Sequence, residues 1–195
     1  MTRRTSTTVR QRQGGRPRAH EGVRSIPCTL VLEKVREQID RTQHLLRQVP
    51  PERLTWRPDL PGAPFTVGVL LGHLLDCLSG FCAVLYGAYP QRLGHFLELK
   101  RLPVNHPCGP EEARDRIATY LDHIEEGFAL LTDEDLGRRV ATAFVPEGEA
   151  VLTLFLGNLE HLINHKFQLF YYLKLLGVPV ATSDLYRLRG EGQSR

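Results

Sequence analysis

Two histidines stand four residues apart in the segment NLEHLINHKFQLFYYLK, residues 158–174, which is otherwise rich in leucine and aromatic residues. On a helix, this is the spacing at which two imidazoles can bind a single metal ion, as in the H-E-x-x-H zinc proteases. The residue that follows His161 is Leu162, so the glutamate base of those proteases is missing. The pair His161 and His165 therefore indicates metal binding without indicating that enzyme class.

Two further polar residues extend the line of the histidines. At about 100° per residue, His161, His165, Gln168 and Tyr172 fall within an arc of roughly 60°, beside a separate apolar face. We expect this line to point toward the interior of a helical bundle or toward its mouth. A buried imidazole needs hydrogen bonds at its ring nitrogens or a metal ion on one of them. Gln168 and Tyr172 are therefore candidate pocket residues, Gln168 either bonding a ligand water or packing against another helix.

A third histidine lies far away in the sequence, in a strongly apolar segment. His73 is the one polar residue in the stretch 67–75. Together with His161 and His165 it would form a triad of imidazoles from two helices, leaving coordination positions open for water, as in catalytic rather than structural zinc sites. The alternative for His73 alone is a core histidine bonded to a backbone carbonyl. The three histidines taken together favour the metal site.

Two neighbours of His73 are weaker candidates. Cys77 lies one turn further on and could be a fourth, soft ligand, although a small core side chain is the interpretation that we favour. Asp76 could be a carboxylate that orients an imidazole from outside the metal's ligand set. A solvated or capping role for Asp76 is the equal alternative.

Four helices separated by proline and glycine must position these residues. The apolar periodicity predicts helices over residues 29–48, 66–86, 110–131 and 151–176. Thr66 is a candidate N-cap and Gly177 a candidate stop. A short helical turn is expected near 184–187, and a short extended piece is possible within 132–150. Without alternating strand patterns or repeats, the fold class is all-α, a four-helix bundle.

The helix predicted at 66–86 is long and apolar enough to be considered as a membrane span, which needs about 20 apolar residues. It contains His73 and Asp76, and a central aspartate costs roughly 2.5–3.5 kcal/mol on insertion scales. We therefore favour a helix buried inside a bundle, and expect no membrane partner.

The charge is unevenly distributed. The whole chain has a net charge of +3. Residues 1–27 contain seven arginines and one acid, Glu21, and therefore carry +6. The rest of the chain therefore carries −3. We interpret 1–27 as a disordered Arg-rich tail and 28–190 as the bundle domain. A transit peptide, or a start codon assigned too far upstream, would give the same composition. Because the domain is slightly acidic, a nucleic-acid partner is not expected.

The four cysteines contain no C-x-x-C pair, and no apolar stretch follows the early arginines as it would in a signal peptide. We therefore expect reduced thiols and a cytoplasmic protein.

These residues and their order resemble the DinB/YfiT-like family of metalloenzymes. The resemblance rests on His73 in an apolar second helix, on the later motif H-x-x-x-H-x-x-Q-L that includes Gln168, and on P-x-x-L-x-W-R-P at 51–58. The motif L-G-V-P at 176–179 fits as well. The resemblance covers roughly residues 30–186.

The resemblance implies a four-helix bundle with a crossover connection, commonly dimeric, that binds zinc or nickel through His73, His161 and His165. It also implies a low-molecular-weight thiol as a second cofactor, with a transferase, isomerase or hydrolase reaction on a small electrophile. The helices offer no strong basic motif for the carboxylates of such a thiol. A non-catalytic, dimeric metal-binding or stress-response module is the alternative.

Overall fold

The computed structural model describes residues 26–62, 65–101, 103–143 and 145–186. The predicted Arg-rich tail, residues 1–27, lies outside these ranges apart from its last two positions. The helices are α1 (Ile26–Leu46), η1 (Pro51–Arg53), α2 (Val67–Ala88), η2 (Gly94–Arg101), α3 (Pro110–Phe128), α4 (Asp133–Leu136), α5 (Val151–Leu175) and α6 (Thr182–Tyr186). Two short strands, β1 (Arg139–Val140) and β2 (Glu149–Ala150), pair antiparallel before α5.

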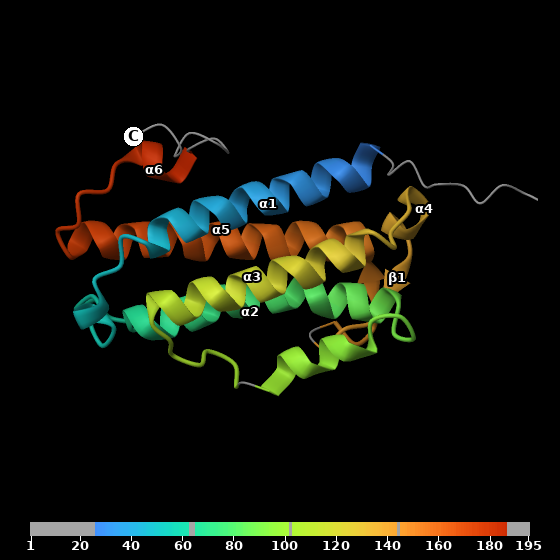
Figure 1. Cartoon of the computed structure of the whole chain (residues 1–195), viewed down its shortest axis with the longest axis horizontal. Helices are drawn as coiled ribbons and strands as arrows, with labels where there is room; N and C mark the ends of the chain where they lie inside the picture. The colour runs from blue at the N-terminus through green and yellow to red at the C-terminus, as the bar shows by residue number, and fades with distance from the viewer. Residues whose placement is uncertain (1–25, 63–64, 102, 144, 187–195) are drawn as a thin grey trace, which may run out of the picture.

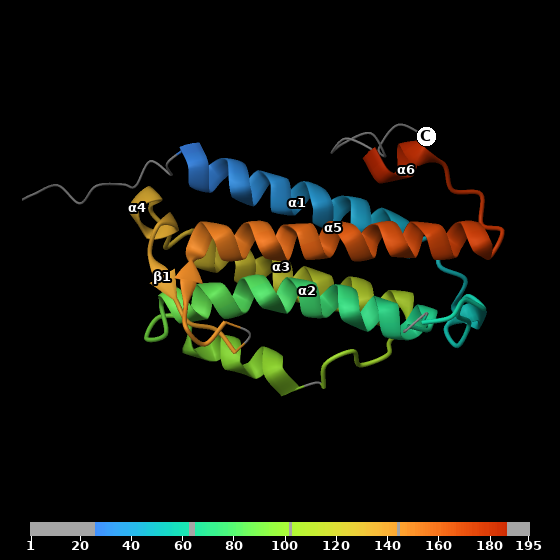
Figure 2. The ribbon, with the colours of Figure 1, turned by 180° about the vertical axis from the view of Figure 1, so that it is seen from behind.

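The four long helices form a bundle in which α1 and α2 each pack against both α3 and α5 (Figure 1, Figure 2). The backbone N–H of Cys108 bonds the carbonyl of Gly68 near the start of α2 and α3, and the Tyr89 hydroxyl bonds the carbonyl of Leu130 just beyond their ends. α2 and α3 therefore run in the same direction, and the chain between them crosses back along the bundle. The predicted all-α four-helix bundle with a crossover connection is confirmed.

The ends of the helices follow the signals in the sequence. The Thr66 hydroxyl accepts a hydrogen bond from the backbone N–H of Val69, as an N-cap does. At the end of α5, Gly177 adopts a positive φ of 77°, and the N–H of Val178 bonds the carbonyl of Leu173. This pattern is a Schellman stop, which favours glycine because a Cβ would be strained there. α1 begins and ends earlier than the predicted 29–48, whereas α2 and α5 match their predictions closely.

α2 is the central helix of the bundle. Among the residues that the structure describes, it alone is long and apolar enough to cross a membrane, yet 67% of its most apolar stretch is buried inside the protein. Its apolar character is therefore satisfied by packing against α3 and α5, as the sequence predicted. A membrane is not needed to account for its composition.

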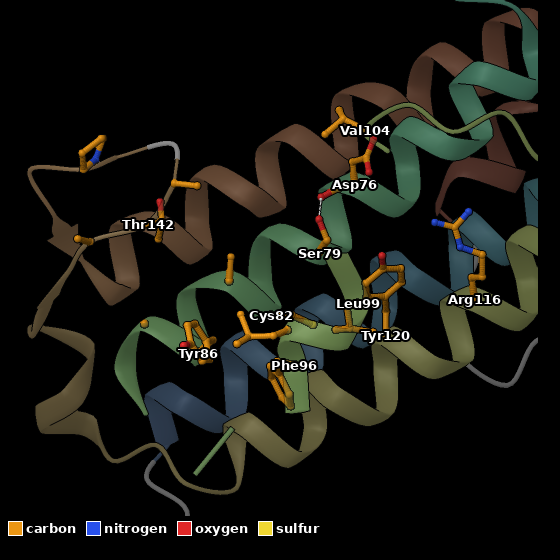
Figure 3. A pocket seen from close by; sticks show the side chains of 16 residues that line it. Asp76, Ser79, Cys82, Tyr86, Phe96, Leu99, Val104, Arg116, Tyr120 and Thr142 are labelled. Carbon is orange, nitrogen blue, oxygen red and sulfur yellow. Dashed lines mark hydrogen bonds between the residues drawn. The ribbon is translucent and has the colours of Figure 1, made fainter. Parts of the chain in front are cut away.

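The connections are more structured than the sequence indicated. The expected extended piece within 132–150 is present as β1 and β2, but η2 and α4 were not predicted. η2 packs against α2 in the crossover. α2, η2, α3 and the loop between β1 and β2 line a cavity of about 700 Å³ (Figure 3).

Candidate metal centre

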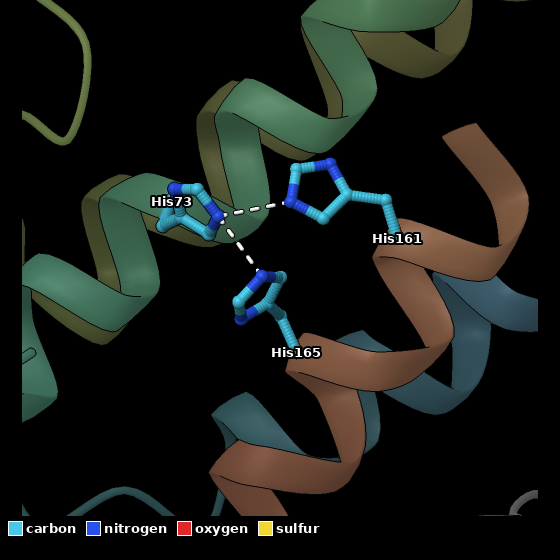
Figure 4. Close-up of side chains that lie close together, drawn as sticks. All are labelled: His73, His161 and His165. Carbon is cyan, nitrogen blue, oxygen red and sulfur yellow. Dashed lines mark hydrogen bonds between the residues drawn. The ribbon is translucent and has the colours of Figure 1, made fainter. Parts of the chain in front are cut away.

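The three predicted histidines converge on one point between α2 and α5. The Nε2 atom of His73 lies 3.1 Å from Nε2 of His161 and 3.0 Å from Nε2 of His165 (Figure 4). Every ligand atom of the triad lies within 4.8 Å of the others. Antiparallel packing of α2 on α5 brings His73 opposite the i, i+4 pair. The cluster could hold a metal ion.

The distances between the nitrogens fit a single divalent ion. Imidazole nitrogens bind zinc at about 2.0–2.1 Å, so two ligands at 90° to 109° around one ion lie about 2.9–3.3 Å apart. The two measured separations, 3.0 and 3.1 Å, fall inside that range. Three neutral imidazoles suit zinc and nickel by their chemistry. The triad therefore fits the predicted group.

His73 is oriented from behind by a loop residue. Its Nδ1 lies 2.5 Å from Oδ1 of Asn105, and the backbone N–H of Asn105 donates to Oδ2 of Asp76 at 2.6 Å. Because an amide oxygen can only accept, Nδ1 of His73 carries the proton and Nε2 presents its lone pair to the other histidines. Asp76 thus acts on the imidazole through Asn105, as a carboxylate outside the ligand set.

The loop can reach His73 because α2 has a glycine at its point of contact. A Cβ at Gly72 would lie 2.1 Å from the carbonyl oxygen of His106. Asn105 has a φ of 58°, in the left-handed region that asparagine tolerates better than most residues. Gly72 and Asn105 are therefore local requirements of the site. The sequence gives no signal for Asn105, because its contact joins positions far apart in the chain.

His165 is held by a relay along α5. Its Nδ1 lies 2.8 Å from Oε1 of Gln168, whose Nε2 donates to the Tyr172 hydroxyl at 3.2 Å. That hydroxyl donates in turn to the backbone carbonyl of Phe65 at 3.2 Å. The relay fixes the proton of His165 on Nδ1 and leaves Nε2 directed at His73. Three members of the predicted polar line of α5, His165, Gln168 and Tyr172, are thus connected by hydrogen bonds.

The electrostatics favour the neutral, metal-binding form of His161 and His165. Burial lowers the pKa of His161 and of His165, and the neighbouring imidazole of His73 lowers both pKa values further. The hydrogen bond from Gln168 opposes part of the shift in the pKa of His165. His161 is the exposed member of the triad, so the site opens to solvent on its side.

Cys77 lies outside the cluster. Its Sγ donates to the carbonyl of His73, one turn back in α2, at 3.3 Å, and the side chain is buried. Burial, with a smaller effect of the Asp76 charge, raises the pKa of the thiol to about 12. A thiol held protonated in this way is a small core side chain, the interpretation that the sequence analysis favoured.

Phe65, also missed by the sequence analysis, closes the apolar side of the triad. Its ring stacks on His73 with centroids 4.8 Å apart and meets the edge of His165 at 5.9 Å. It lies just before the N-cap Thr66, a position that gives no sequence signal for such a contact.

Comparison with known proteins agrees with this arrangement. The family model of the DinB superfamily matches residues 34–169. The solved structure of a DinB-family protein from Exiguobacterium sibiricum is 21% identical, with a TM-score of 0.59, and the match covers 83% of this chain and 99% of that one. A DinB-like protein from Bacillus subtilis is 18% identical, with a TM-score of 0.57, over 76% of this chain and 92% of that one.

A mycothiol-dependent maleylpyruvate isomerase has the same fold at greater distance. It is 13% identical with a TM-score of 0.54, and the match covers 74% of this chain and 61% of that one. Comparison with curated proteins gives no significant match. Since the family model spans well over half of the sequence and the bundle agrees with it, this chain belongs to the DinB superfamily.

Proposed function

We propose that this protein is a metal-dependent enzyme in which His73, His161 and His165 hold a zinc or nickel ion. The reaction is a thiol-dependent transfer to a small electrophile, or its hydrolysis. The observation that carries the proposal is the meeting of three Nε2 atoms from two helices, with separations that suit one ion. A divalent ion bound there supplies Lewis acidity, which lowers the pKa of a coordinated thiol or water toward neutrality.

The protein's own residues prepare the site for this chemistry. Asn105 and Gln168 keep the protons of His73 and His165 on Nδ1, so that the Nε2 lone pairs face inward. The exposed side of the triad, at His161, leaves an approach for a small molecule. The ring of Phe65 stacks on His73 and gives the triad an apolar neighbour.

A low-molecular-weight thiol is the proposed second cofactor. Its support is the fold shared with an isomerase whose activity depends on mycothiol. At 13% identity this likeness concerns the fold alone, so the thiol is proposed for this chain by family membership.

We further propose a cytoplasmic homodimer that acts on a small molecule, without a membrane or nucleic-acid partner. Sedimentation equilibrium of the purified chain tests the dimer.

Metal analysis tests the site. We expect about one zinc or nickel ion per chain in the wild-type protein and almost none in the double variant His161→Ala/His165→Ala. His123→Ala is the matched control, because this histidine lies on α3 and its Nδ1 bonds the carbonyl of Thr119. Equal metal in the wild type and the double variant would exclude the proposal.

The alternative is a non-catalytic, dimeric metal-binding or stress-response module. The observation that favours it is that the triad joins α2 to α5, so that a bound ion would stabilise the bundle even without turnover. Thermal melting with and without chelator, together with a screen of thiols against model electrophiles, separates the two. Metal-dependent turnover that the double variant loses supports the enzyme, whereas a large melting shift without turnover supports the module.

A further inference from the structure

The cavity between α2, η2 and α3, called here the second cavity, lies beside the metal centre, and Asp76 and Val104 belong to its wall. Its volume of about 700 Å³ falls within the range of about 300–1,000 Å³ that is usual for small-molecule sites. Side chains of α2, η2 and α3 line it, together with residues 141–143 and Pro146 of the hairpin loop (Figure 3). None of the three histidines is part of the wall, so the cavity is distinct from the space between the imidazoles.

The body of the cavity is apolar. Cys82 from α2 and Phe96 and Leu99 from the η2 segment lie at its centre. At its rim, the side chains of Leu97 and Val104 are 45% and 67% exposed. These two aliphatic side chains are exposed to water at the mouth of an apolar cavity. An apolar molecule bound in the cavity would cover them, which is favourable.

Polar groups gather at one end of the cavity. Figure 3 shows Asp76, Ser79, Tyr120 and Arg116 on the same side, away from Tyr86 and Thr142. The guanidinium of Arg116 lies 3.4 Å from the carboxylate of Glu112. Burial raises the pKa of the neighbouring Tyr120 hydroxyl, and the positive charge of Arg116 opposes part of that rise.

The charges at this end already have partners. Arg116 lies beside the carboxylate of Glu112, and the carboxylate of Asp76 accepts a hydrogen bond from the backbone N–H of Asn105 at 2.6 Å. A charged ligand group would have to compete with these partners. A carboxylate in the ligand would meet Asp76, and an ammonium group would meet Arg116. A group that both donates and accepts hydrogen bonds without carrying charge fits both sides.

We propose that this cavity binds an uncharged amphipathic small molecule. Its aliphatic or aromatic body lies over Cys82, Phe96 and Leu99, and a hydroxyl or amide group lies between Asp76 and the Arg116–Tyr120 pair. The proposal does not depend on the three histidines. The cavity shares one residue with the metal centre, Asp76, whose carboxylate also bonds the backbone of Asn105.

Calorimetric titration with three probes that share one body tests the ligand class: 1-octanol, octanoate and octylamine. We expect 1-octanol to bind at least about 10-fold more tightly than either charged probe, because desolvating a charge without a matching partner is costly. The affinity for 1-octanol is expected to be the same in His161→Ala/His165→Ala, which separates this result from the metal site.

Substitutions in the wall test the location. Ala83→Phe fills the cavity and should weaken binding of 1-octanol at least about 10-fold. Ala118→Phe makes the same change at an exposed position of α3 and should leave binding unchanged. Tyr120→Phe removes one hydrogen-bonding group and should weaken binding about 2- to 10-fold. Circular dichroism of each variant checks the fold.

Three results would overturn the proposal. The first is no detectable binding of 1-octanol by the wild type up to its solubility limit. The second is tighter binding of octanoate or octylamine. The third is equal binding by the wild type and Ala83→Phe or, should that variant not fold, by the wild type and Tyr120→Phe.

Discussion

At the scale of single residues, Asn105 and Gln168 determine which nitrogen of two imidazoles faces the centre of the triad. Each presents an amide oxygen to Nδ1, at 2.5 Å for His73 and 2.8 Å for His165. A histidine whose Nδ1–H is held in this way offers Nε2 to a metal without an entropic cost of ring rotation. The third imidazole, His161, is exposed, and its Nε2 lies 3.1 Å from Nε2 of His73.

Gln168→Ala removes one of these supports. We expect the affinity for zinc to fall about 10- to 100-fold, since residues that orient a ligand typically contribute that much. Competition against a chromophoric chelator measures it. Gln48→Ala, at an exposed position just after α1, is the control and should not change the affinity. Equal affinities for Gln168→Ala and the wild type would show that the relay does not position His165.

The lowered pKa values of His161 and His165 predict a pH dependence of stability in the metal-free protein. Both pKa values lie below the ordinary 6.5 in the folded state, so the unfolded chain binds more protons as the pH falls below 6.5. The free energy of unfolding of the wild type, relative to that of His161→Gln/His165→Gln, should be constant above pH 6.5 and should decrease below pH 6.5. Urea unfolding in chelator between pH 5 and 8 measures this. A relative stability that rises on acidification would contradict the prediction.

At the scale of elements, the site depends on how closely the crossover loop approaches α2. Gly72 makes this possible, because the carbonyl of His106 occupies the space of a side chain there. The same approach places Asn105 behind His73 and Val104 at the rim of the second cavity. One short loop therefore contributes to both candidate sites, and a shift of that loop would affect them together.

Gly72→Ala tests the loop. The new methyl group would force the loop away from α2, and we expect a loss of about 1–3 kcal/mol in the free energy of unfolding, with weaker metal binding. Gly157→Ala is the matched control in α5, where a Cβ would meet nothing within 4 Å. That variant should be stabilised by about 0.5–1 kcal/mol, since alanine is the better helix former. A Gly72→Ala protein as stable as the control would show that the loop is not confined.

At the scale of the whole molecule, the helices and the histidines could be predicted from the sequence for different reasons. The helices follow from local signals: the apolar periodicity, the cap at Thr66 and the stop at Gly177. The triad followed from residue chemistry, because histidine is conspicuous in an apolar helix. Asn105 carries no such signal, since its role exists only after the crossover has folded back onto α2. The cavity also depends on that crossover and on η2, which the periodicity did not indicate.

The junction of α1 with α5 contains a buried lysine that makes the stability of the whole bundle depend on pH. Lys166 is 4% exposed, and its Nζ donates to Oε1 of Gln38 at 2.6 Å. Burial, with a smaller effect of Arg41, lowers the pKa of this amine from 10.5 to about 8. Between these values the unfolded chain binds more protons than the folded one, so the free energy of unfolding should rise with pH, by at most about 3 kcal/mol.

Lys166→Met should remove this rise, whereas Lys174→Met, at an exposed position of α5, should retain it. Urea unfolding at pH 7, 8, 9 and 10 compares the three proteins, and parallel curves for the wild type and Lys166→Met would show that the amine is not confined by the bundle.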